Sequence, residues 1–143
     1  MAVSAYDELP KNAANFVALS PLRYLERAAH IYPHQAAMIH GSRQITWREK
    51  YTRCRQFAHQ LNQLGIGKND TVSVLLPNIP AMIEAHFAVP MAGAVLNTLN
   101  TRLDAKTLAF MLKHAETKVL LVDPEFAAVA TEALALVPQD IYV

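Results

Sequence analysis

Two short apolar runs constrain the fold of this chain more than any other feature. The runs are VSVLL at 72–76 and KVLLV at 118–122, and neither shows the polar–apolar alternation of a half-exposed strand. A strand with apolar side chains on both faces is typical of a parallel sheet that helices cover on both sides. The sequence therefore predicts a layered α/β fold with mostly parallel strands and helices packed on the sheet.

A helix and a β-hairpin are expected ahead of this layered unit. Ser20 and Pro21 supply an N-cap and a first-turn proline for a helix that stops at Pro33. Residues 36–40 and 43–46 are short strand-like runs with a glycine between them. A glycine allows the positive φ of a tight turn, so the two runs predict a hairpin.

The rest of the chain alternates between helical and strand patterns. Thr46 and Glu49 have the spacing of a capping box, which starts a helix that ends near Gly65. Beyond it the pattern predicts strands at 71–76, 94–97 and 118–122, the start of a strand at 141, and helices at 80–91, 104–115 and 124–135. Alternation at this spacing again favours an α/β fold rather than an all-α or all-β one.

The composition narrows the class of protein. Of 143 residues, 52% are apolar and 17% are charged, which indicates a chain that forms a core. A net charge of +1 gives no global field that would attract nucleic acid or an anionic membrane. The single cysteine excludes an internal disulfide, no apolar run reaches the length of a spanning helix, and the N-terminus lacks the pattern of a signal peptide. These features predict a soluble, cytoplasmic protein without a transmembrane segment.

Common phosphate and metal motifs are missing from the sequence. The four glycines cannot form a dinucleotide-binding fingerprint or a P-loop. His30 and His34 are four residues apart, but Pro33 interrupts the helix that would place them on one face. The other histidines lie on separate predicted elements, and one cysteine cannot build a zinc site. No metal site is predicted.

Two features in or next to the helix that follows Thr46 admit both a functional and a structural interpretation. Cys54 lies on its apolar stripe, which favours a buried structural thiol over a nucleophile. A cluster of basic residues gives a local charge excess that could face phosphate or coenzyme A. A solvated helix face is the more common reason for such a cluster. Its members are Arg43, Arg48, Lys50, Arg53 and Arg55.

Two further candidates lie near the second half of the predicted sheet. Glu84 and His86 are polar residues in a helix that is apolar almost all round, so each needs a partner or an exposed edge. The segment NTLNTR at 97–102 leaves a predicted strand at its carboxyl end, where open α/β sheets bind ligands. Asparagine and threonine also form turns and caps, and this simpler interpretation is favoured.

Several of these segments together resemble the N-terminal part of the adenylate-forming acyl-CoA synthetases. The matching segments are TWRE at 46–49, GIGKNDTVSVLLPNIPAMIEAHFAVPMAGAVLNTLNTRL at 65–103, and KVLLVD at 118–123. Their order and spacing are similar to those of the family over about 20–137. The form of 88–103 is most similar to the branch that activates short- and medium-chain or other small carboxylic acids.

The resemblance implies an ATP-dependent ligase reaction for the full-length enzyme. A carboxylate attacks ATP with Mg²⁺ to give an acyl-adenylate and diphosphate, and coenzyme A then displaces AMP. The family's phosphate loop, ribose aspartate and catalytic lysine lie downstream of the matched region. No residue of this chain matches them, so no catalytic, cofactor-binding or metal-binding residue is assigned, and none of the cofactors is expected to bind this chain tightly.

The expected organisation follows from the resemblance. Residues 1–19 form a lead-in, and 20–143 form the N-terminal portion of the adenylate-forming domain, truncated inside the strand that starts at 141. The isolated chain is expected to be inactive and to lack its main partner, the downstream part of the same domain. A different hypothesis is a non-catalytic remnant that acts as an interaction module through the surface that the downstream part would cover.

Overall fold

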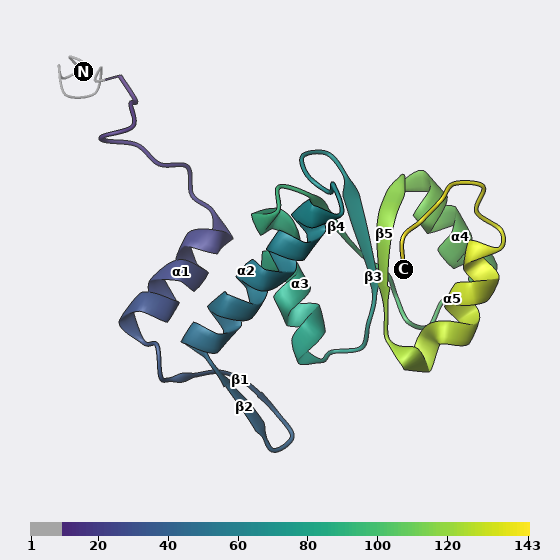
Figure 1. Cartoon of the computed structure of the whole chain (residues 1–143), viewed down its shortest axis with the longest axis horizontal. Helices are drawn as coiled ribbons and strands as arrows, with labels where there is room; N and C mark the ends of the chain where they lie inside the picture. Colours follow the sequence, from purple (N-terminus) through teal and green to yellow (C-terminus); the bar gives the residue numbers. More distant parts are fainter. Residues whose placement is uncertain (1–9) are drawn as a thin grey trace, which may run out of the picture.

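The computed structural model describes residues 10–143 and has the layered α/β architecture that the apolar runs predict (Figure 1). A helix and a hairpin precede a three-stranded sheet with two helices on each side. In chain order the elements are α1 (Pro21–Ile31), β1 (Ala36–His40), β2 (Arg43–Thr46), α2 (Trp47–Gln63), β3 (Thr71–Leu75), α3 (Pro80–Met91), β4 (Val95–Thr98), α4 (Ala105–His114), β5 (Thr117–Val122), the 3₁₀ turn η1 (Pro124–Phe126) and α5 (Ala127–Leu134).

The sheet has the strand order β4-β3-β5, and both pairs are parallel. Val72 of the central strand lies beside Leu96 on one side and Val119 on the other. All five residues of β3 are buried, which accounts for the continuous apolar run in its sequence. The parallel arrangement expected from the two runs is therefore confirmed.

Each face of the sheet has its own core. Val72 and Val74 point toward α2 and α3, where they pack with Leu61 and Val89. Leu75 points to the opposite face, where α4 and α5 pack on the sheet. Side chains alternate along a strand, so one strand supplies both cores.

Helix α1 packs beside α2 on the side away from the sheet, and the hairpin lies at the N-terminal end of α2 (Figure 1). The capping box is present: the Thr46 hydroxyl accepts a hydrogen bond from the Glu49 amide, and the Glu49 carboxylate accepts one from the Thr46 amide. These bonds satisfy backbone donors that would otherwise be free at the helix start. Gly41 has a φ of +58°, the left-handed conformation that the hairpin turn requires.

Two expectations for the C-terminal part need correction. The helix expected at 124–135 begins with the 3₁₀ turn η1, in which the Phe126 amide donates a hydrogen bond to the Asp123 backbone oxygen three residues earlier. The strand expected from 141 consists of a single parallel bridge between Tyr142 and Val119. No helix within residues 10–143 is both long and apolar enough to cross a membrane.

Candidate functional site

A polar cluster lies between α2 and α3, although most of this interface is apolar. The Arg53 guanidinium forms two hydrogen bonds to the Glu84 carboxylate, one from Nε and one from Nη2 at 2.9 Å. The Glu84 side chain is 7% exposed, whereas that of Arg53 is 41% exposed. The hydrogen bond to Glu84 raises the pKa of Arg53. Glu84 therefore belongs to a satisfied network rather than to an open site.

Lys50 is the one member of the basic cluster whose position differs clearly from a solvated helix face. It is 5% exposed, and its ammonium group lies 4.3 Å from the centroid of the Phe87 ring and 5.2 Å from that of Trp47. Burial lowers its pKa, because desolvation disfavours the charged form. A signal was available in the sequence: Lys50 is three residues from Trp47 and four from Cys54, on the same apolar stripe.

The remaining arginines of the basic cluster are exposed. Arg43 and Arg48 line an open hollow of about 360 Å³ that also contains Arg53. The Glu49 carboxylate lies in the same hollow and offsets part of the positive charge. Such a surface can attract an anion weakly, and it has the character of a solvated helix face.

Cys54 is fully buried at the same interface. Its thiol lies 3.7 Å from the backbone oxygen of Glu84 and donates a weak hydrogen bond to it. Burial is the main cause that raises its pKa, from 9.0 to about 11. A thiol with a raised pKa forms little thiolate at neutral pH, so this side chain has the properties of a core residue rather than of a nucleophile.

The raised pKa of Cys54 predicts a loss of stability at high pH. Between pH 9 and about 11 the folded state retains the thiol proton, whereas the unfolded chain releases it. The stability that the Cys54 thiol contributes is therefore fully present below pH 9 and is lost as the pH rises through 11. Two pKa units correspond to about 2–3 kcal/mol. We expect urea titrations at pH 8 and pH 11.5 to show this loss in the wild type.

Cys54→Ala is the control for this prediction. Below pH 9 the substitution lowers stability by the cost of a small cavity, but it removes the Cys54 part of the slope at higher pH. Lys50 contributes in the opposite sense, because its lowered folded pKa makes stability rise with pH. Since both proteins retain Lys50, the difference between their pH profiles isolates the thiol. Parallel profiles would contradict the prediction.

The histidines do not come together. His86 is exposed on α3, and its Nδ1 lies 2.8 Å from the backbone oxygen of Met82 in the preceding turn. His114 stacks on Phe110 of its own helix, with the ring centroids 5.7 Å apart. Within residues 10–143 no group of three or more histidine, cysteine, aspartate or glutamate side chains is placed to hold a metal ion.

The segment 97–102 serves the sheet and the next helix. Asn97 donates a hydrogen bond of 2.9 Å to the Ser73 hydroxyl, which is 2.7 Å from the Thr117 hydroxyl. These three residues link β4, β3 and β5 on the α4–α5 face. Farther along, the Asn100 side chain accepts a hydrogen bond from the Arg102 amide and forms the turn before α4. The polar residues of this segment thus act as turn and packing elements.

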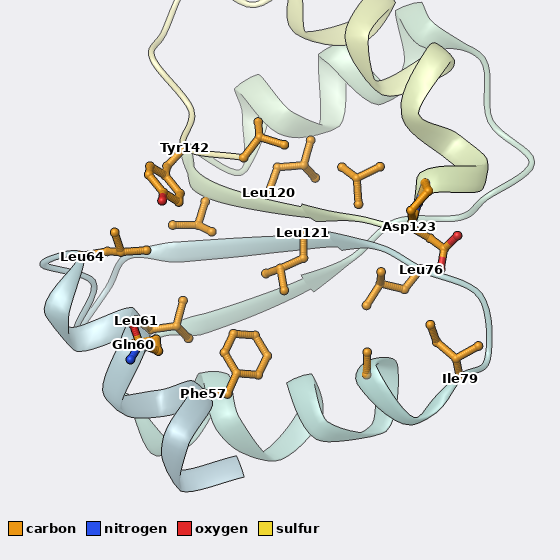
Figure 2. A pocket seen from close by; sticks show the side chains of 15 residues that line it. Phe57, Gln60, Leu61, Leu64, Leu76, Ile79, Leu120, Leu121, Asp123 and Tyr142 are labelled. Atoms are coloured by element: carbon orange, nitrogen blue, oxygen red, sulfur yellow. The ribbon is translucent and has the colours of Figure 1, made fainter. Parts of the chain in front are cut away.

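One concave feature was not predicted from the sequence. An apolar pocket of about 500 Å³ lies between β5 and helices α2 and α3, and it runs along the sheet from Leu64 and Tyr142 to Ile79 and Asp123 (Figure 2). Phe57 projects into it from α2. The apolar stripe of α2 was a partial signal, but the sequence pattern could not show that the sheet leaves part of that stripe uncovered.

This set of side chains does not fit the chemistry of a nucleotide site. The pocket is lined almost entirely by hydrocarbon, and Asp123 at one end is its single carboxylate. The glycines with positive φ are Gly41, Gly65 and Gly93, which lie in three separate turns and form no phosphate-binding loop. A site for ATP with Mg²⁺ needs converging backbone amides and oxygen ligands. The residues that the structure describes supply neither.

The chain is similar to plant acid–CoA ligases. It is 55% identical over 134 residues to an acetate–CoA ligase of Humulus lupulus, which covers 94% of this chain and 24% of that protein. It is 51% identical over 133 residues to a peroxisomal acetate/butyrate–CoA ligase of Arabidopsis thaliana, covering 93% of this chain and 23% of that protein. The chain thus spans about a quarter of the length of these relatives.

The cytoplasmic location expected from the sequence is wrong. Several relatives that share about half of their residues with this chain are named as peroxisomal ligases, among them the acetate/butyrate–CoA ligase and a butyrate–CoA ligase of Arabidopsis thaliana. Composition and charge do not distinguish a cytoplasmic from a peroxisomal protein, because peroxisomal addresses are short sequences read by a receptor and leave no trace in the bulk composition.

Solved structures and a family model agree with these relatives. The fatty acyl CoA synthetase of Mycobacterium tuberculosis superposes with a TM-score of 0.77 at 26% identity, covering 85% of this chain and 26% of that one. The o-succinylbenzoate coenzyme A synthetase of Bacillus subtilis gives a TM-score of 0.72 at 27% identity, covering 82% and 24%. The model of the AMP-binding enzymes matches residues 25–141. The chain belongs to the family of AMP-binding enzymes.

Proposed function

We propose that this chain is the N-terminal scaffold of an ATP-dependent acid–CoA ligase. In this proposal residues 20–143 form the N-terminal portion of the AMP-binding domain, and residues 1–19 form a lead-in to it. The observation that carries the proposal is the 55% identity to an acetate–CoA ligase over nearly the whole chain. Identity at this level covers the sheet, its helices and the segment 97–102 together.

The proposed substrate is a small carboxylic acid. Relatives that are about half identical to this chain are named for acetate, butyrate, trans-cinnamate and benzoate. These acids share a single carboxylate on a short or compact apolar body, and the first two are short fatty acids. The complete ligase would convert such an acid, ATP and coenzyme A into acyl-CoA, AMP and diphosphate through an acyl-adenylate.

ATP, Mg²⁺ and coenzyme A belong to this proposal as cofactors and co-substrate of the complete ligase. The side chains of residues 10–143 converge on no phosphate or metal site, so we assign the chain no catalytic or cofactor-binding residue. Its proposed role is to hold the sheet and the covering helices in place beside the reaction site. Catalytic groups are then supplied by polypeptide outside the 143 residues.

A segment exchange tests this role. We expect the 143-residue chain, mixed with ATP, Mg²⁺, coenzyme A and acetate, butyrate or benzoate, to form no acyl-CoA above a blank. When the chain replaces the matching segment of the Humulus lupulus acetate–CoA ligase, we expect acetyl-CoA formation with kcat/KM within about tenfold of that ligase. Both reactions are followed by chromatography of the CoA thioesters.

A matched control shows what loss of activity looks like when the exchanged segment misfolds. The same exchange with Leu75→Ala, which opens a cavity in the buried central strand, should lose most of its activity together with its cooperative melting. A wild-type exchange that folds cooperatively but forms no acetyl-CoA would contradict the proposal. Turnover by the isolated chain would contradict the assignment of catalytic groups to other polypeptide.

A further inference from the structure

We propose that the solvent-facing side of α2 binds an acidic, extended segment of another protein. The side chains concerned are Arg48, Thr52, Arg55 and His59, called here the α2 stripe, and all four are exposed. Their spacing of three and four positions places them on one side of the helix. The opposite side, which includes Cys54, packs in the core. The interaction does not depend on the proposed ligase reaction, because the stripe lies outside any site assigned to it.

The charge of the chain is unevenly distributed along the sequence. Residues 10–55 contain eight lysines and arginines and two acidic residues, a formal charge of +6, whereas 56–143 contain five and eight, a formal charge of −3. The net charge of +1 therefore conceals a basic region that comprises α1, the hairpin and the first half of α2. Exposed charges act over roughly 8 Å at physiological salt, so the local charge decides what this region attracts.

The α2 stripe lies along a row of three adjoining hollows of about 360, 320 and 440 Å³. Thr52 lines the first and the second, and Arg55 lines the second and the third. The row begins beside the hairpin, where Arg43 joins Arg48, and ends where α1 packs beside α2 (Figure 1). An elongated depression of this kind fits a segment of chain better than a flat membrane surface.

Three arginines of the row are available to a ligand. Within residues 10–143 no acidic side chain forms an ion pair with Arg43, Arg48 or Arg55. The two carboxylates that line the hollows are already engaged, Glu49 in the capping box of α2 and Glu26 in an ion pair of 3.6 Å on α1. The guanidinium donors of the three arginines therefore face solvent, and carboxylates are their preferred partners.

The spacing of the stripe arginines favours an extended partner. Arg48 and Arg55 are seven positions apart, which is two helical turns or roughly 10.5 Å along the axis of α2. In the polyproline II conformation, side chains three positions apart project on the same side and are roughly 9 Å apart. An extended segment with an acidic residue at every third position can therefore contact both arginines at once.

An acidic protein segment fits the stripe better than other anions do. A single small anion binds weakly here, because exposed ion pairs are screened by solvent and salt, whereas a segment with several carboxylates joins such contacts. Single-stranded nucleic acid binds through aromatic side chains on which its bases stack, and membrane docking needs exposed apolar side chains beside the basic ones. The α2 stripe contains no phenylalanine, tyrosine, tryptophan or aliphatic side chain.

Peptide binding tests this assignment. The probe is a labelled peptide of four Glu-Ala-Pro repeats, in which proline favours the polyproline II conformation, and its Gln-Ala-Pro counterpart is the uncharged control. Affinity for the 143-residue chain is measured by fluorescence anisotropy at low salt. We expect Arg48→Gln combined with Arg55→Gln to weaken binding of the acidic peptide by about tenfold or more. Lys106→Gln combined with Lys113→Gln removes the same charge from exposed positions of α4 and should change the affinity less than about threefold.

Several results would overturn the proposal. They are equal losses for the two double variants, no binding of the acidic peptide, equal binding of its uncharged counterpart, and equal or tighter binding of a single-stranded oligonucleotide or of phosphatidylserine vesicles. Near-UV circular dichroism checks that each variant is folded. If the 143-residue chain does not melt cooperatively, the same variants are measured in the segment-exchanged ligase. Anisotropy needs neither ATP nor coenzyme A, so failure of the ligase proposal leaves this test intact.

Discussion

Replacing Arg53 with methionine should destabilise the protein by about 2–3 kcal/mol in urea unfolding at pH 7. The substitution keeps the aliphatic stem of the side chain but leaves the Glu84 carboxylate without its two guanidinium bonds. Because Glu84 is 7% exposed, water replaces those bonds poorly. A fully buried pair would cost more, but Arg53 is 41% exposed and part of the interaction is screened by solvent.

Two further variants identify the cause of this loss. Arg48→Met removes an exposed arginine from the same helix, and we expect a change below about 0.5 kcal/mol. Adding Glu84→Gln to Arg53→Met should recover part of the stability, because an uncharged amide costs less to bury than an unpaired carboxylate. If Glu84→Gln lowers the free energy of unfolding by the same amount in Arg53→Met as in the wild type, the two residues are not coupled.

The second large effect is expected at the centre of the sheet. Leu75 is 0% exposed on β3 and packs with Leu108, Leu112 and Leu120 under α4 and α5. Leu75→Ala should cost about 3–4 kcal/mol, since it removes three carbon atoms and leaves a cavity that the strands on either side prevent from closing. Urea unfolding followed by circular dichroism measures the change.

Leu136→Ala is the matched control for Leu75→Ala. Leu136 is 57% exposed after α5, so the same chemical change should alter the free energy of unfolding by less than about 0.5 kcal/mol. A similar loss for the two variants would mean that the core on the α4–α5 face does not carry the stability assigned to it. A ratio above about five would support the packing described for β3.

The sequence was most informative where local chemistry decides the structure. The capping box at Thr46 and Glu49 fixed the start of α2, because both partners are three residues apart in one turn. The apolar runs of β3 and β5 indicated a sheet buried on both faces, which is the arrangement observed. The start of the last helix was less well predicted, since a 3₁₀ turn, with a hydrogen bond from the Phe126 amide to the Asp123 backbone oxygen, precedes it.

The candidate site was harder to predict, because it depends on contacts between distant residues. Glu84 clearly needed a partner, yet nothing local identified Arg53, which is 31 positions earlier in the chain. Lys50 was grouped with the solvated arginines, although it is buried against the rings of Trp47 and Phe87. The apolar pocket along β5 also depends on which part of α2 the sheet leaves uncovered.

By itself the sequence determined the α/β class, the order of the elements, the starts of the helices before α5 and the resemblance to a ligase family. These properties follow from periodicity, capping and short segments, all of which act over a few residues. Only the tertiary structure decided that β3 is central, that Glu84 pairs with Arg53, and that Tyr142 forms a parallel bridge to Val119 of β5. The physical reason is that strand order, buried ion pairs and pockets are set by packing between segments far apart in the chain.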